Sequence, residues 1–127
     1  RRVLFRSAGP GRGATPPNFE GTPPDRGMPT NTLLAEVIKS AGSYSNVDVG
    51  GAAAANQQEL HDCLRMMFPF TANTMHTRVS TAWDLATAMK LLEKDLGYKG
   101  LYTIEANGGH QGTKAIYDVV VATLTGM

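Results

Sequence analysis

Three side chains with ligand chemistry recur at one point of a repeated pattern in this 127-residue sequence. Asp48, His76 and Glu105 each follow an apolar residue near the end of a short apolar run. One imidazole and two carboxylates form a ligand set that Mg2+, Mn2+, Co2+ or Zn2+ accepts. The two carboxylates would repel each other unless a cation lay between them. If the three side chains lie together, the sequence therefore predicts a divalent-metal site.

Arg78 stands two residues beyond His76, and so on the same face of an extended strand. Its guanidinium suits an anionic group of a substrate, but an arginine here is equally compatible with a surface cation. Taken singly, each member of the trio also has an ordinary explanation. Asp48 precedes two glycines as a turn residue does, His76 could be a hydrogen-bonded histidine, and Glu105 could be a solvated strand end. Their common position in three successive units favours a shared site.

The elements that would position these residues alternate along the chain. The expected helices are 31–41, 56–67, 82–96 and 113–123, and the expected strands are 46–49, 74–79 and 101–105. Such alternation with short connections favours an α/β fold with a parallel sheet covered by helices. The carboxyl ends of parallel strands meet at one edge of the sheet, where sites are commonly built.

Apolar spacing also predicts which helix faces are buried. On the first helix the predicted inward stripe is Leu33, Leu34, Val37, Ile38 and Ala41, and on the last it is Ile116, Val119, Val120 and Leu124. Gly42 and Gly97 are expected to end the first and third helices. Asn56, with Glu59 three residues later, resembles a capping box at the start of the second helix.

The first thirty residues differ from the rest. They hold eleven Gly or Pro and show no helix or strand periodicity, which predicts a loop or disordered segment before a domain at 31–127. Residues 2–7 resemble the translation of a sequencing-library adapter. We therefore treat residues 1–7 as an artefact, and expect the chain to be a piece of a longer one.

The composition of the chain limits the classes of partner that it is expected to bind. Residues 31–127 carry seven basic and nine acidic side chains, so their net charge of −2 offers no basic surface for nucleic acid. No apolar run approaches the roughly 18–20 residues of a membrane span. The single cysteine, Cys63, excludes an internal disulfide and suits a reducing compartment. We expect a cytoplasmic protein with a small-molecule ligand.

Four segments of the chain resemble the xylose-isomerase-like superfamily of TIM barrels, the sugar-phosphate isomerases and epimerases. They are LLAEVIKSAG, NVDVGG, FPFTANTMHTRV and LGYKGLYTIEANG, and the last is the most specific. The resemblance covers residues 31–124. It implies that residues 31–127 form the C-terminal part of a (β/α)8 barrel, about three βα units with a preceding helix. A whole barrel needs about 250 residues.

The resemblance also implies roles for the residues. Asp48, His76 and Glu105 match three of the four metal ligands of the family, Glu105 matches a catalytic acid or base, and Arg78 stands where a substrate contact is common. Two departures matter. Many members carry a histidine where this chain has Gly51, and Pro17 stands where the fourth ligand, a glutamate, is expected. We expect that ligand to belong to a preceding part of the gene.

The implied function is a divalent-metal-dependent sugar or sugar-phosphate isomerase or epimerase, with Mn, Mg, Co or Zn as the metal. The parent protein could be a homo-oligomer, and the isolated 127-residue chain is expected to be inactive. Three alternatives remain at this point: a polyol dehydratase using the same site, an abasic-site endonuclease of the same fold, and a non-catalytic barrel remnant.

Overall fold

A computed structural model gives the structure of the chain and describes residues 28–49, 54–106 and 109–127. The elements in these ranges are α1 (Met28–Ala41), β1 (Ser45–Asp48), α2 (Gln57–Met67), β2 (Thr71–Thr77), α3 (Leu85–Lys90), β3 (Leu101–Ile104) and α4 (Gly109–Thr125). A 3-10 turn, η2 (Phe68–Phe70), joins α2 to β2, and a π-helical turn, η3 (Leu91–Asp95), continues α3. A loop was expected over residues 1–30, but residues 28–30 form the first turn of α1. Residues 1–27 and the glycines at 50–51 lie outside the described residues.

Helices and parallel strands alternate as the sequence predicts. In the described part of the chain the sheet has the order β1-β2-β3, and both strand pairs are parallel. Asp48 is the partner of His76, and Thr77 is the partner of Ile104. The strand β3 begins at Leu101 as expected, and the other strand limits differ from the expected ones by one to three residues. The strand β2 begins earlier than expected, directly after η2 ends at Phe70. The α/β class with a parallel sheet is confirmed.

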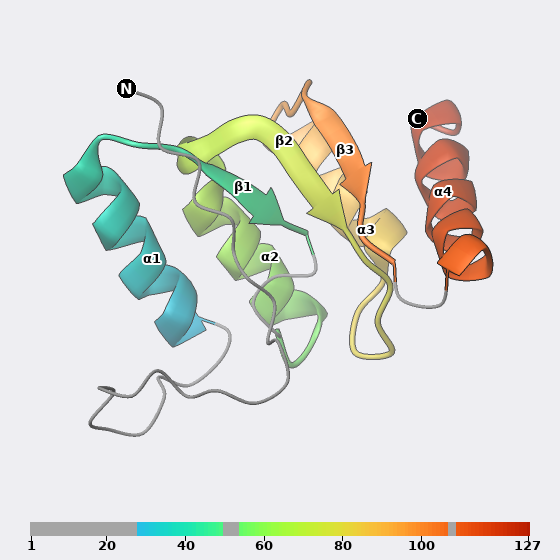
Figure 1. Cartoon of the computed structure of the whole chain (residues 1–127), viewed down its shortest axis with the longest axis horizontal. Helices are drawn as coiled ribbons and strands as arrows, with labels where there is room; N and C mark the ends of the chain where they lie inside the picture. The colour runs from blue at the N-terminus through green and yellow to red at the C-terminus, as the bar shows by residue number, and fades with distance from the viewer. Residues whose placement is uncertain (1–27, 50–53, 107–108) are drawn as a thin grey trace.

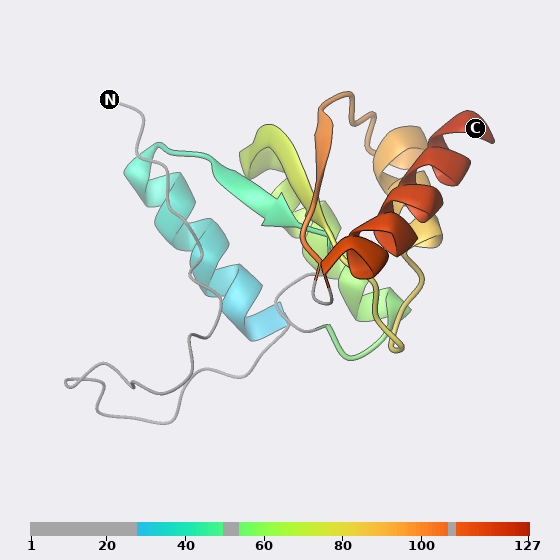
Figure 2. The same ribbon diagram turned by 45° about the vertical axis from the view of Figure 1, so that its right-hand side comes forward.

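The helices cover one face of this sheet. Figure 1 shows α2 and α3 behind the strands, with α1 beside β1 and α4 beside β3, and Figure 2 shows the same layering after rotation. The apolar residues of the strands face the helices: Val47 and Met75 are buried, and Tyr102 and Ile104 are packed against the core. Because successive strand residues point to opposite faces, Asp48 and His76 lie on the face away from the helix layer.

The second helix begins as its capping pattern predicts. The Asn56 side chain accepts a hydrogen bond from the Glu59 backbone N–H, at 3.0 Å. The Glu59 carboxylate in turn accepts one from the Ala55 N–H, one residue further back than in a standard capping box. The apolar stripe of this helix, Leu60, Leu64 and Met67, is buried.

The third helix begins three residues later than expected, at Leu85. Asp84 has an extended backbone, and its side chain accepts a hydrogen bond from the Thr87 N–H at 2.7 Å. A carboxylate in this position satisfies a helix N–H that would otherwise lack a partner. Gly97 adopts a φ of 71° just after the helix, as its expected role at the helix end requires.

We expect the Asp84 cap to contribute about 1 kcal/mol to the free energy of unfolding at neutral pH. The hydrogen bonds from Thr87 lower the pKa of Asp84 below its ordinary value of 3.8. The stabilisation is therefore fully present above pH 3.8 and is lost as the pH falls through the lower folded-state pKa. Urea unfolding of Asp84→Ala and of the wild type between pH 7 and pH 3 measures it. Asp84→Asn, which keeps an acceptor oxygen, should remove the pH dependence at this position; an unchanged dependence would contradict the assignment.

The predicted inward stripe of α1 is largely wrong. Of the predicted residues only Ile38 is buried, together with Ala35, which the prediction left out. The exposed members are Leu33, Leu34, Val37 and Ala41. Figure 1 explains the difference, since α1 lies at the side of the molecule and, besides a smaller contact with η2, meets the rest through α2. That contact also buries a polar residue, Asn31, which donates a hydrogen bond to the Cys63 sulfur at 3.3 Å.

The predicted inward stripe of α4, at the other side of the sheet, is largely confirmed. Ile116 and Val120 are buried and Val119 is partly buried, as predicted, but Leu124 is exposed. The helix begins at Gly109, four residues before its expected start. No helix among the described residues is both long enough and apolar enough to span a membrane.

Candidate functional site at the strand ends

The structure brings the four predicted site residues together. Asp48 is the last residue of β1, His76 is the penultimate residue of β2, and Glu105 directly follows β3. The strands hold this arrangement through backbone hydrogen bonds from Val49 N–H to the His76 carbonyl and from Glu105 N–H to the Thr77 carbonyl. The parallel register therefore places the three side chains at one end of the sheet, on the face without helices.

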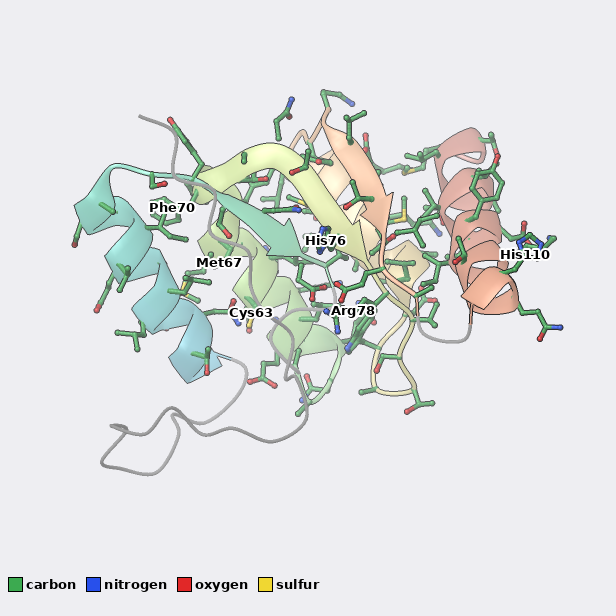
Figure 3. All side chains as sticks on the ribbon, viewed as in Figure 1. Cys63, Met67, Phe70, His76, Arg78 and His110 are labelled. Carbon is green, nitrogen blue, oxygen red and sulfur yellow. The ribbon has the colours of Figure 1, made fainter. Side chains whose placement is uncertain are left out.

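Arg78 connects the two carboxylates. Its Nη2 donates a hydrogen bond to Glu105 Oε2 at 2.7 Å, and its Nε lies 3.0 Å from Asp48 Oδ2. His76 Nδ1 lies 3.3 Å from the same Glu105 oxygen. The predicted trio and Arg78 thus form one ion-pair network, with the guanidinium between the carboxylates of Asp48 and Glu105. Figure 3 shows where His76 and Arg78 lie at this end of the sheet.

The two contacts of Arg78 differ in quality. The Nε group is buried but lacks a well-directed hydrogen bond, although Asp48 is within ion-pair distance. We take the contact as electrostatic attraction rather than a formed hydrogen bond, because hydrogen bonds weaken steeply when the donor is misaligned. The Asp48, His76, Arg78 and Glu105 side chains are 28%, 35%, 41% and 47% exposed. Solvent therefore reaches the network, and its ion pairs are partly screened.

The geometry of these four residues bears directly on the predicted metal site. In the described part of the chain, no three His, Cys, Asp or Glu side chains are grouped closely enough to hold an ion. The guanidinium of Arg78 takes the charge-balancing position between Asp48 and Glu105. The donors themselves suit a divalent ion, since a nitrogen and two carboxylates share one partly exposed face. Asp48, His76 and Glu105 could coordinate an ion if the Arg78 side chain moved away from the two carboxylates.

A further polar residue of this face, Asn46, was not among the residues predicted from the sequence. It precedes Asp48 by two residues on β1, so both side chains lie on the same face. Its Oδ1 atom is buried, and no donor among the described residues satisfies it. A buried amide oxygen without a donor is costly. The alternation of polar residues in 46–48 was the signal that could have identified it.

The other histidines lie on helices. His110 is an exposed residue of the first turn of α4, and not of the preceding loop as its sequence context suggests. Figure 3 shows it well apart from His76 and Arg78. His61 is half-buried on α2, 2.8 Å from the Gln57 side chain. Burial, and then the charge of Arg65, lower the pKa of His61, which favours a neutral imidazole.

Comparison with known protein families, with curated proteins and with solved structures finds no match to this chain.

Proposed function

We propose that this chain is the C-terminal part of a (β/α)8 barrel of the xylose-isomerase-like kind. Its function would be divalent-metal-dependent isomerisation or epimerisation of a sugar or sugar phosphate. The observation that carries the proposal is the gathering of Asp48, His76 and Glu105 at the carboxyl ends of adjacent parallel strands. The layering also supports it, since the polar strand face would line the inside of a barrel and the helices its outside.

Asp48, His76 and Glu105 are the residues that would hold the metal. When bound, the ion would polarise the substrate carbonyl and its neighbouring hydroxyl, and so acidify the C–H bond between them. Glu105 is the acid or base of the proposal, because a partly exposed carboxylate can accept a proton from that carbon and return it. The Nδ1 atom of His76, 3.3 Å away, helps to fix the orientation of this carboxylate. Arg78 would hold an anionic group of the substrate.

Metal binding to the full 127-residue chain tests the proposal. We expect Mn2+, followed by electron paramagnetic resonance, to bind the wild type. The Asp48→Asn and Glu105→Gln substitutions should each weaken binding at least about tenfold, since each removes an anionic ligand. Asp62→Asn is the matched control, because Asp62 pairs with Arg65 on α2 and lies outside the strand-end network. Absence of Mn2+ binding, or binding indifferent to Asp48 and Glu105, would overturn the proposal and favour a non-catalytic ion-pair network.

A further inference from the structure

We infer that Arg78 is an internal cation that competes with the divalent metal for Asp48 and Glu105. Metal binding would release its guanidinium to an anionic ligand, so that metal and anion each strengthen the binding of the other. The inference rests on the proposed function and identifies its substrate as one that carries a phosphate or carboxylate group.

The competition follows from the atoms that Arg78 contacts. Its Nη2 lies 2.7 Å from Glu105 Oε2, which is also the oxygen that His76 faces. Its Nε lies 3.0 Å from Asp48 Oδ2. A metal held by His76 and both carboxylates would need the same region and would repel the guanidinium. The ion and the present position of Arg78 are therefore mutually exclusive.

The surroundings of Arg78 allow its side chain to leave Asp48 and Glu105. Its side chain is 41% exposed, and the next residues, Val79 and Ser80, are exposed. The long Arg78 side chain can therefore change its orientation without leaving a cavity in the core. Its misdirected Nε contact means that only part of its hydrogen-bonding capacity is lost on leaving. Once freed, a guanidinium binds phosphate or carboxylate through paired N–H donors.

Removing the internal cation should tighten metal binding. We expect Arg78→Met to bind Mn2+ about tenfold more tightly than the wild type, within the usual range of coupling between two bound ligands. Arg65→Met is the control, because Arg65 pairs with a carboxylate on a helix surface at 3.8 Å and should leave Mn2+ affinity unchanged. Circular dichroism of each variant verifies that it is folded.

The anion arm uses sulfate as the probe, replacing chloride at constant ionic strength. Sulfate should tighten Mn2+ binding to the wild type severalfold and leave Arg78→Met unaffected, because the freed guanidinium is then missing. Equal or weaker Mn2+ binding by Arg78→Met, or an equal sulfate effect in both proteins, would overturn the inference while the metal site stands. Absence of Mn2+ binding in both proteins would instead overturn the proposed function, and the inference with it.

Discussion

Replacing Gly100 with alanine is expected to lower the free energy of unfolding by about 3 kcal/mol. A β-carbon at this position would overlap the carbonyl oxygen of Asn73 and lie 2.5 Å from the Tyr98 hydroxyl oxygen. Neither the Asn73 carbonyl nor the Tyr98 hydroxyl can easily move away. Asn73 lies in an irregular part of β2 with a φ of 67°, and the Tyr98 hydroxyl donates to the Leu101 carbonyl at 2.8 Å.

Urea unfolding of Gly100→Ala measures this effect, and Gly42→Ala is the matched control. Gly42 has a φ of 59° but no atom within 4 Å of an added β-carbon. Its replacement should therefore cost only the left-handed backbone strain, about 1 kcal/mol. A loss in Gly100→Ala no larger than that in Gly42→Ala would show that Asn73 and Tyr98 can move aside, and would contradict the need for glycine at position 100.

Leu64→Ala is expected to cost about 3 kcal/mol, the middle of the usual range for a buried leucine. Leu64 is 1% exposed and belongs to the core between the sheet and the helices. Leu33→Ala is expected to change the free energy of unfolding by less than about 0.5 kcal/mol, because Leu33 is 52% exposed.

The same denaturant titration compares the two leucines, which have identical chemistry and both lie on helices. The difference between them tests the arrangement of α1 at the side of the molecule. A loss at Leu33 comparable to that at Leu64 would mean that the outer face of α1 is covered in solution, contrary to the described structure.

The position of the candidate site was predictable because it depends on local order and on parallel topology. Short apolar runs between helices required parallel strands, and parallel strands place their carboxyl ends together. Asp48, His76 and Glu105 were identified by that argument, and Arg78 by the two-residue period of a strand. These rules concern only neighbours in sequence and the direction of strands, so the residue pattern was sufficient.

Burial on the outer helices was not predictable in this way. Leu33, Leu34 and Val37 have helical apolar spacing, but spacing fixes only which residues share a face and not whether another element covers it. The buried face of α1 includes Ala35 and Ile38, and of these only Ile38 belongs to the predicted stripe. The start of α3 was predicted too early for a related reason. The apolar pattern begins at residue 82, but Asp84 caps the helix, which therefore begins at Leu85.

The sequence by itself determined the alternation of elements, the α/β class and the identities of the four side chains at the strand ends. Only the tertiary structure decided how those side chains pair. The register of β1, β2 and β3 brings Asp48 and Glu105 within reach of one guanidinium, that of Arg78 just after the strand between them. Charge attraction then makes Arg78 part of the network itself. Coulomb interactions depend on distances in space, which the spacing of residues along the chain does not contain.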